Sequence, residues 1–268
     1  MSGNPQSISL DIEGWSVTYT GGGKQVHAVK SCSLSVSRGK IVGLVGESGS
    51  GKSTLLMSVP KLLPPGTITS GSIRCAGEEI SRLGEDEINL WRWRRIALIP
   101  QGAMNSFTPH LTIERHISEV LARHLGTPKH DRAGIAAELA ATAGLERAVL
   151  YRYPHELSGG QKQRAALSLA LACGPDFLLA DEPTTALDVI TQKGVLETIA
   201  SLVREHGMGL LLVTHDLPLA AVVSDSLVVM KDGEFVEQGS SGEVSRSPRH
   251  PYTQKLVAAI RDMDGDRQ

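Results

Sequence analysis

The sequence lacks both a long apolar run and an excess of positive charge. Its longest apolar stretch, from Ala165 to Cys173, has nine residues, whereas a membrane-spanning helix needs about 18. The 27 Lys and Arg residues face 29 Asp and Glu, giving a formal net charge of −2, and general nucleic-acid-binding proteins usually carry a basic excess. With 41% hydrophobic residues, the composition also excludes a disordered chain. We therefore expect a soluble globular protein with no nucleic-acid partner.

Cysteine and aromatic residues are scarce as well. The three cysteines, Cys32, Cys75 and Cys173, stand far apart without metal-ligand spacing, which favours a reducing compartment over a disulfide framework. Residues 1–10 show no basic start followed by an apolar stretch, so no secretory signal is visible and we expect a cytoplasmic protein. Because aromatics make up only 4% of the chain, aliphatic side chains must build most of the core.

Apolar segments alternate with helical patterns along much of the chain. A helix should begin near Lys52 and end at Pro60, and another should span 189–206, with Gly207 as its C-terminal cap. Continuous apolar runs are typical of strands covered on both faces of a parallel sheet. Such strands are predicted at 40–45, 96–99, 177–180 and 210–214. This alternation predicts an α/β fold.

Two regions depart from this alternation. Residues 104–172 have a mostly helical pattern, which predicts a helical insert between two strands. Residues 227–236 predict a β-hairpin, because Asp232-Gly233 separates two apolar strands.

Two further clusters have both a functional and a plain interpretation. His110, His116, His124 and His130 lie 6, 8 and 6 residues apart, which does not place them on one helical face. We interpret them as solvated surface histidines rather than as a metal site. Residues 91–95, Trp-Arg-Trp-Arg-Arg, resemble a nucleic-acid patch. We interpret them instead as the basic end of a helix with an acidic start at 85–87, because both ends then complement the helix dipole.

A phosphate-binding motif, G-x-x-x-x-G-K-[ST], follows the first predicted strand and precedes a predicted helix. Glycines let backbone N–H groups surround a phosphate, and the helix N-terminus adds positive potential there. Lys52 should neutralise the β- and γ-phosphates of a nucleotide, and the Ser53 hydroxyl should ligate Mg²⁺. The alternative is an ordinary glycine-rich turn. The motif comprises Gly46, Glu47, Ser48, Gly49, Ser50, Gly51, Lys52, Ser53 and Thr54.

Two carboxylates, Asp181 and Glu182, follow the apolar strand at 177–180. In a protein with this phosphate-binding loop, an Asp at a strand end usually holds Mg²⁺. Glu182 is then placed to polarise the attacking water. An acidic turn without function is the alternative, and the neighbouring phosphate motif argues against it.

The segment Leu157-Ser158-Gly159-Gly160-Gln161 resembles the signature sequence of ATP-binding cassette (ABC) ATPases. A Ser and two glycines at a helix N-terminus form a second anion site. The resemblance implies that Ser158, Gly159, Gly160 and Gln161 close on ATP held by an opposite subunit.

The same resemblance implies a P-loop (RecA-like) fold with an N-terminal antiparallel β subdomain and a helical insert. One ABC ATPase domain would then cover 1–268, with a nucleotide-binding core at 1–101 and 173–238. The helical subdomain would be 102–172, and 239–268 would be a short C-terminal extension.

Further site residues follow only from the resemblance. Tyr19 matches the aromatic residue that stacks on adenine, and Gln101 matches the glutamine that contacts Mg²⁺ and water. His215 matches the switch histidine that contacts the γ-phosphate, and residues 186–188, Ala-Leu-Asp, match a dimer-contacting loop. The implied catalytic residues are Glu182, His215 and Gln101, and the implied Mg²⁺ ligands are Ser53, Gln101 and Asp181.

A narrower resemblance concerns importers of peptides and nickel. Residues 100–109 and 247–256 are similar to segments of that subfamily, although Gly102 and Ala103 depart from its usual residues. A longer cysteine-containing tail, common in peptide importers, does not follow 260, which favours the shorter members that move nickel or metal chelates.

The resemblance also implies the partners and the location. The partners would be two transmembrane permease subunits, a second ATP-binding subunit that is identical or paralogous, and, indirectly, an extracytoplasmic solute-binding protein. The chain would lie peripherally on the cytoplasmic face of the inner membrane. The alternative is a non-transport ABC ATPase of translation, DNA repair or cofactor assembly, but the single cassette without a coiled-coil or zinc insert argues against it. The cargo stays open between peptides, nickel and metal chelates.

Overall fold

The computed structural model describes residues 8–21, 23–185 and 187–265, with side chains for all of these except Met104, Val189 and 260–265. The chain forms two compact units. The first combines the N-terminal part up to Ile88 with the part that begins at Gly209, and the second comprises Asn89–Met208.

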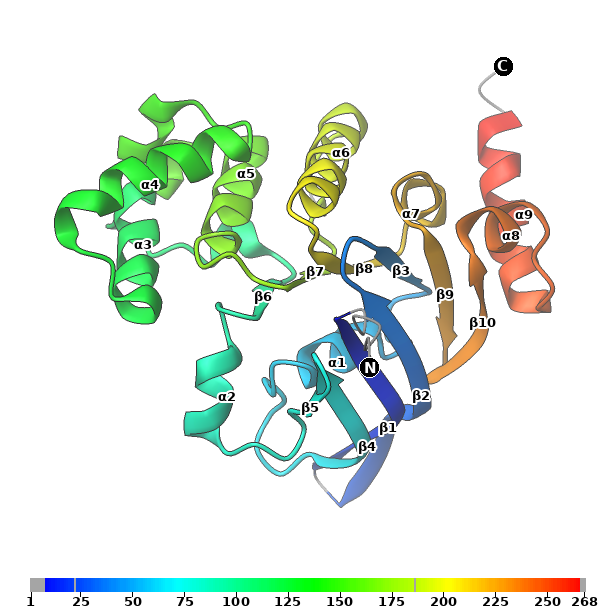
Figure 1. The fold of residues 1–268 in the computed structure, drawn as a ribbon. Coiled ribbons are helices and arrows are strands. Elements are labelled where there is room, and N and C mark those ends of the chain that lie inside the picture. Colours follow the sequence, from blue (N-terminus) through cyan, green and yellow to red (C-terminus); the bar gives the residue numbers. More distant parts are fainter. Residues whose placement is uncertain (1–7, 22, 186, 266–268) are drawn as a thin grey trace, which may run out of the picture. The chain divides into compact units, whose positions relative to one another are not determined.

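An antiparallel sheet opens the first unit (Figure 1). It contains β1 (Ser9–Gly21), β2 (Lys24–Ser37), β4 (Ile68–Cys75) and β5 (Glu78–Glu79), in the order β2-β1-β4-β5. Alternating aliphatic residues such as Leu10, Ile12 and Val17 are buried, each at most 1% exposed, as expected for a sheet with one covered face. The antiparallel β subdomain implied by the resemblance is therefore confirmed.

A mixed sheet forms the other part of the first unit. Its strands are β3 (Ile41–Val45), β8 (Gly209–Thr214), β9 (Ser226–Lys231) and β10 (Glu234–Ser240), in the order β10-β9-β3-β8. β3 runs parallel to β8 and β9, whereas β10 pairs with β9 antiparallel. All residues of β3 and β8 are buried, which confirms the prediction made from their continuous apolar runs. The predicted hairpin is also confirmed, because Asp232 and Gly233, with φ of 49° and 85°, adopt the left-handed conformations of a tight two-residue turn.

Four helices accompany this mixed sheet within the described part of the first unit (Figure 1). α1 (Lys52–Ser58) ends just before Pro60, as predicted. α7 (Leu217–Val223), α8 (Ser241–Arg246) and α9 (Pro251–Gly265) follow β8 and β10. Side chains from these three helices and from β3 and β9 form one hydrophobic cluster: Val45, Leu217, Ala220, Leu227, Val229, Val244, Tyr252 and Val257.

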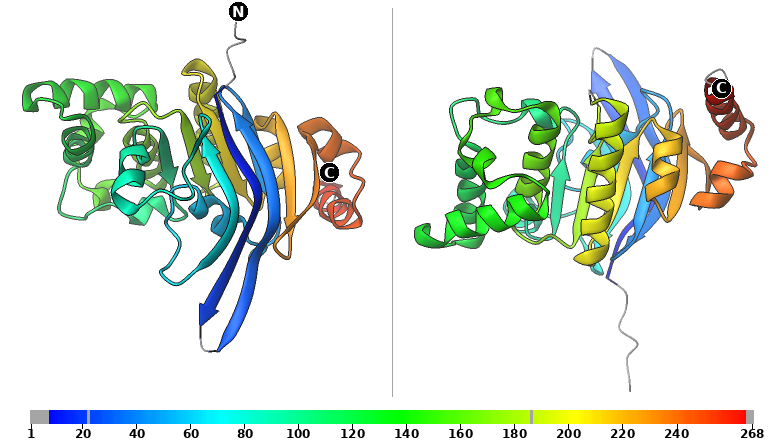
Figure 2. Two further views of the ribbon diagram at one scale, coloured as in Figure 1. Left: turned by 60° about the horizontal axis from the view of Figure 1, so that its bottom comes forward. Right: turned by 90° about the horizontal axis from the view of Figure 1, so that it is seen from above.

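The second unit contains a parallel strand pair and a group of helices (Figure 2). β6 (Ile96–Ile99) pairs in parallel with β7 (Phe177–Asp181). The region between them is helical, as predicted for 104–172. Its helices are η1 (Ala103–Asn105), α3 (Ile113–Val120), η2 (Leu121–Leu125), α4 (Lys129–Thr142), η3 (Arg147–Tyr151), η4 (Pro154–Glu156) and α5 (Gly159–Ala170). α6 (Val189–Glu205) follows β7, and Gly207 with φ of 62° confirms the expected cap.

One predicted helix end is wrong. α2 (Glu85–Trp91) has the expected acidic first turn but ends at Trp91, so no basic residue lies in its last turn. The chain then turns at Trp93, which has φ of 69° and donates its backbone N–H to the carbonyl of Ile96 at 2.8 Å. Arg94 and Arg95 therefore belong to a turn that leads into β6, and Arg92 forms an isolated bridge with Ile96.

No helix in the described ranges is long and apolar enough to cross a lipid bilayer.

Candidate nucleotide-binding site

The phosphate-binding motif forms the loop between β3 and α1. Two of its glycines lie where any Cβ would clash with backbone. A Cβ on Gly46 would lie 2.1 Å from the carbonyl oxygen of Met230, and one on Gly51 would lie 2.2 Å from that of Ala28. Gly51 also has φ of 106°, which L-residues rarely adopt. The loop conformation therefore requires glycine at both positions.

Lys52 is enclosed by this loop. Its side chain is only 4% exposed, and its Nζ donates to the carbonyl oxygens of Gly46 at 2.9 Å and Glu47 at 2.7 Å and to Ser50 Oγ at 3.3 Å. The next residue, Ser53, is exposed in the first turn of α1. A buried cation and an exposed hydroxyl are thus placed side by side at the start of a helix, where anions bind well.

Tyr19, the residue matched to adenine stacking, lies beside the same helix. It comes from β1, and its Oη donates to Thr54 Oγ1 at 3.1 Å. Tyr19 and Thr54 are 35 residues apart in the chain. A tyrosine of the first strand therefore lies beside the last residue of the phosphate motif.

His215 lies at the same sheet edge as the phosphate loop. Val45, the last residue of β3, pairs with Thr214, the last residue of the parallel strand β8. The residues that follow, Gly46 and His215, therefore leave neighbouring strands at their carboxyl ends. This edge is where ligands bind in open parallel sheets.

The second unit brings Gln101 and Glu182 together. Ile99 of β6 pairs with Ala180 of β7 in parallel, so both residues follow the carboxyl ends of adjacent strands. Gln101 Nε2 donates to Glu182 Oε2 at 3.2 Å. Asp181, the residue before Glu182, is 3% exposed at the end of β7.

Thr185 is a partner of Glu182 that the sequence interpretation missed. Its Oγ1 donates to Glu182 Oε2 at 2.9 Å, so the carboxylate accepts from two side chains on the same oxygen. Glu182 itself has φ of 44°, a conformation that is costly for a residue other than glycine and typical of functional sites. No sequence pattern marks this partner, because the bond depends on the turn that follows β7.

The signature segment caps helix α5. Ser158 is the N-cap, where its Oγ accepts from the backbone N–H of Gln161 at 3.3 Å and its own N–H donates to Gln161 Oε1 at 3.1 Å. This reciprocal pair is a capping box. Gly160 leaves little room, because a Cβ there would lie 3.1 Å from Thr191 Cγ2. These residues therefore cap helix α5 and let it pack closely against Thr191, in addition to any role toward ATP.

The dimer-contacting loop is described only in part. Ala186 lies outside the described residues, whereas Asp188 is the N-cap of α6, accepting from the backbone N–H of Thr191 at 3.0 Å and from its hydroxyl at 2.7 Å. Both bonds lower the pKa of Asp188 below its ordinary value, and the bond from the Thr191 hydroxyl has the larger effect.

The chain is also similar in sequence to known proteins. The family profile described as "ABC transporter" matches residues 29–185 of the chain. The chain belongs to the ABC transporter family.

Two curated relatives and one solved structure are similar to this ABC chain over most of its length. A putative peptide import ATP-binding protein of Brucella abortus strain 2308 is 41% identical over 260 residues, covering 94% of this chain and 77% of the relative. A probable D,D-dipeptide transport ATP-binding protein of Escherichia coli K12 is 37% identical over 263 residues, covering 97% and 80%. A dimeric ATP-binding cassette in a post-hydrolysis state with ADP and Pi matches with a TM-score of 0.77 and 30% identity, covering 87% of this chain and 98% of that one. The expected P-loop ABC fold is thereby confirmed.

The histidines of the ABC chain do not gather into a metal centre. Within the described ranges no group of three or more His, Cys, Asp or Glu side chains is placed to hold a metal ion. The interpretation as solvated surface histidines is wrong for His124, which is half-buried with its ring centroid 5.7 Å from that of Trp93. It is also wrong for His116, which is half-buried as well. Its Nε2 accepts from the backbone N–H of Thr108 at 2.9 Å, and its ring meets Phe107 edge-on at 5.2 Å. His116 thus orders the turn that precedes α3.

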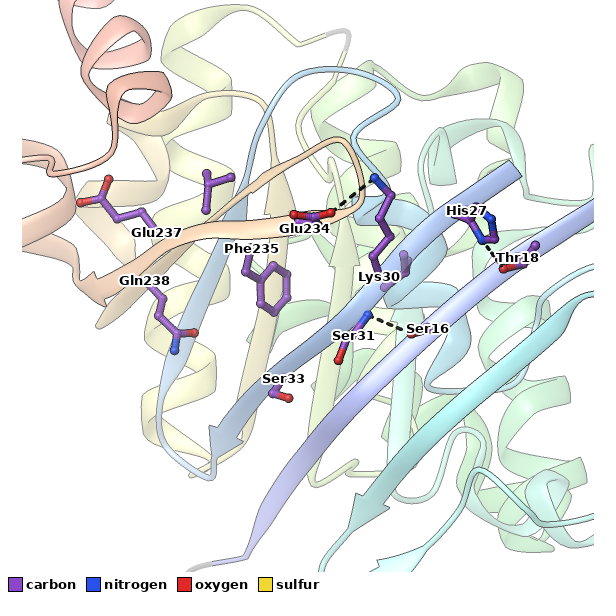
Figure 3. Close-up of a pocket in the computed structure, with 12 residues that line it drawn as sticks. Ser16, Thr18, His27, Lys30, Ser31, Ser33, Glu234, Phe235, Glu237 and Gln238 are labelled. Atoms are coloured by element: carbon purple, nitrogen blue, oxygen red, sulfur yellow. Dashed lines mark hydrogen bonds and ion pairs between the residues drawn. The ribbon is translucent and has the colours of Figure 1, made fainter. Parts of the chain in front are cut away.

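A groove of about 780 Å³ lies in the first unit (Figure 3). β2 lines one side of it and β10 the other, and none of the predicted site residues is among its lining. Some of its polar groups pair with one another, as shown by Lys30 with Glu234 at 3.5 Å and by the N–H of Ser31 with Ser16 Oγ at 2.8 Å. This groove is therefore not the predicted nucleotide site, whatever its size.

Proposed function

We propose that the chain is the ATP-binding and ATP-hydrolysing subunit of an ABC importer that takes up peptides through partner membrane subunits. The observation that carries ATP binding is the glycine loop that encloses Lys52 beside an exposed Ser53 and the Tyr19 ring. Import of peptides is supported by relatives named for peptide import and D,D-dipeptide transport, each covered to three quarters or more. A non-transport ABC ATPase is not favoured.

ATP binding follows from the chemistry of the loop. The backbone N–H groups at 46–54 and the Lys52 ammonium surround the phosphates, as in other P-loops. The Tyr19 ring stacks on the adenine. While the Gly46 and Glu47 carbonyls hold the Lys52 ammonium in place, Lys52 exchanges its longer bond to Ser50 Oγ for a bond to a phosphate oxygen, which is stronger because both partners are charged.

Hydrolysis is assigned to the carboxylate at the end of β7. Glu182 acts as the general base that takes a proton from the attacking water. Gln101 and Thr185 orient this carboxylate through their bonds to Oε2, and Gln101 also contacts the water. His215 contacts the γ-phosphate as charge develops on it.

The P-loop motif also implies Mg²⁺, and the available donors suit that ion. Ser53, Gln101 and Asp181 offer hydroxyl, amide and carboxylate oxygens, the donor type that Mg²⁺ prefers. Asp181 is almost fully buried, and buried carboxylates are normally paired with or coordinated to cations. When bound, Mg²⁺ supplies positive charge that neutralises phosphate oxygens.

A second subunit completes the site in this proposal. Ser158, Gly159, Gly160 and Gln161 close on the ATP held by an identical or paralogous partner, so that ATP stabilises the closed pair. Solved cassettes similar to this chain are dimeric. The helical subdomain, proposed as 102–172 between core segments 1–101 and 173–238, passes the motion to two permease subunits, and 239–268 forms a short extension. The chain then works peripherally at the cytoplasmic face of the inner membrane, and an extracytoplasmic binding protein supplies the solute.

Equilibrium binding of ATP in the presence of Mg²⁺ tests the assignment of the loop. Lys52→Ala should raise the Kd for ATP at least about tenfold, because a desolvated charge-assisted contact is lost. Lys129→Ala, an exposed lysine on α4, is the matched control and should leave the Kd unchanged. Equal affinity of the wild type and Lys52→Ala would refute the phosphate site. Stimulation of ATPase activity by peptide in the reconstituted complex tests the cargo.

A further inference from the structure

The C-terminal helix reaches the phosphate loop through one hydrogen bond. The backbone N–H of Glu47, the second residue of the loop, donates to Tyr252 Oη at 3.1 Å. The two residues are 205 positions apart in the chain, and both belong to the first unit. Tyr252 stands in the first turn of α9.

The Tyr252 ring is held firmly in place. The residue is 7% exposed and belongs to the same hydrophobic cluster as Val45, the last residue before the loop. The Nζ of Lys231 lies 5.1 Å from the ring centroid, within the range of a cation–π contact. The neutral phenol oxygen of Tyr252 accepts the Glu47 N–H, and burial raises the pKa of this phenol further above its ordinary value.

The start of α9 is held as well. Glu237 on β10, labelled in Figure 3, accepts from the backbone N–H groups of Arg249 at 2.7 Å and His250 at 3.0 Å. The Gln254 side chain donates back to the carbonyl of Pro248 at 3.0 Å. These bonds fix the backbone just ahead of Tyr252 relative to the sheet.

Both backbone polar groups of Glu47, its N–H and its carbonyl, form hydrogen bonds. Its N–H is held by Tyr252, and its carbonyl oxygen accepts from Lys52 Nζ at 2.7 Å and from the backbone N–H of Ser50 at 3.2 Å. A shift of this backbone segment therefore moves a carbonyl that positions the phosphate-binding lysine.

We propose that Tyr252 is a positioning residue for ATP binding, which holds the Glu47 backbone and thereby the entrance of the phosphate loop in its binding conformation. This inference rests on the proposed function of the loop. It assigns the C-terminal segment around 247–256 a direct part in nucleotide affinity. If Tyr252 served only to fill the core, its ring would suffice and its hydroxyl would be dispensable.

Tyr252→Phe separates these two roles, because it keeps the ring and removes the hydroxyl, which accepts from the Glu47 N–H and also bonds to the Glu47 side chain. The Kd and KM for ATP should rise about three- to tenfold, the equivalent of one neutral hydrogen bond, while kcat changes less than about twofold. Tyr151→Phe, which alters a tyrosine that is 57% exposed, should match the wild type. The amide proton of Glu47, followed by NMR, should shift upfield and exchange faster with solvent in Tyr252→Phe alone.

The outcomes separate this inference from the proposed function. If the wild type does not bind ATP, the proposed function fails. If the wild type binds ATP and Tyr252→Phe binds it equally well with an unchanged Glu47 amide, the positioning role is refuted. An altered amide with unchanged ATP affinity also refutes it, because the contact would then exist without affecting the site.

Discussion

Glu182 combines an unfavourable backbone conformation with a well-ordered carboxylate. Its φ of 44° costs on the order of 1–3 kcal/mol for a residue that is not glycine. The bonds from Gln101 and Thr185 to one carboxylate oxygen hold the side chain in a fixed direction. Backbone strain together with a fixed side chain is expected at a site of chemistry, where the direction of the carboxylate matters more than the stability of the fold.

Cys173 gives a prediction about reactivity. Burial raises the pKa of its thiol to about 11, although Arg94 nearby lowers it slightly, and burial also raises the pKa of Cys32. At pH 8 the native Cys173 should therefore react with Ellman's reagent about 100-fold more slowly than a free cysteine, because only the thiolate attacks. Absorbance of the released thiolate measures this rate, and unfolding in guanidinium should restore fast reaction. Comparison with the Cys173→Ser variant shows how much of the absorbance comes from Cys173. The prediction would be contradicted if the native wild type showed a fast reaction that the variant lacks.

At the residue scale, motif residues were predictable from the sequence and their long-range partners were not. Lys52 and Glu182 lie in short patterns in which each position has its own chemical reason. Thr185 shows no such pattern, because its role depends on the turn that follows β7. The partnership of Glu47 with Tyr252 spans 205 positions and depends on where α9 packs, which no local pattern encodes.

At the level of elements, the capping box of α5 gives a test of local stability. Ser158→Ala should lower the free energy of unfolding by about 1 kcal/mol, because the N–H of Gln161 loses its acceptor. Ser158→Asn should recover most of this loss, since Asn also caps helices well. Urea denaturation measures both variants. Equal stability of Ser158→Ala and the wild type would show that the cap contributes nothing.

Glu237, which holds the start of α9, gives a prediction about pH. Burial raises its pKa, but the backbone bond from Arg249, the side chain of Thr253 and the backbone bond and charge of His250 together outweigh burial. The folded-state pKa therefore lies below the ordinary 4.5. A lowered folded-state pKa means that the stabilisation is complete above the unfolded-state pKa and is lost as pH falls through the folded-state pKa. The stability difference between the wild type and Glu237→Gln should therefore be constant from about pH 5.5 upward and shrink below 4.5. Urea denaturation at several pH values measures it, and a difference that grows on acidification would contradict this account.

Strands were easier to predict than helix ends. β3, β7 and β8 are buried along their whole length, so continuous apolar runs marked them. The end of α2 was misplaced, because its stop depends on the left-handed turn at Trp93 and no Gly or Pro marks it. The pairing of β1 with β2 includes register shifts, which also leave no clear pattern in the sequence.

At the scale of the whole molecule, the predicted site residues fall into two sets. Tyr19, the phosphate loop with Lys52, and His215 belong to the first unit, whereas Gln101, the β7 carboxylates and the signature segment belong to the second. The proposed chemistry divides in the same way, with ATP binding assigned mainly to the first set and water activation to the second. A variant in each set should therefore separate binding of ATP from its turnover.

Hydrolysis of ATP by Glu182→Gln, measured beside its ATP affinity, tests the central claim most directly. The amide cannot accept the proton of the attacking water, so turnover should fall at least about 100-fold while the Kd for ATP stays within about threefold of the wild type. Glu197→Gln, an exposed glutamate on α6 with its side chain 56% exposed, should hydrolyse ATP like the wild type. Unimpaired turnover by Glu182→Gln would contradict the assignment of Glu182 as the base of an ABC ATPase.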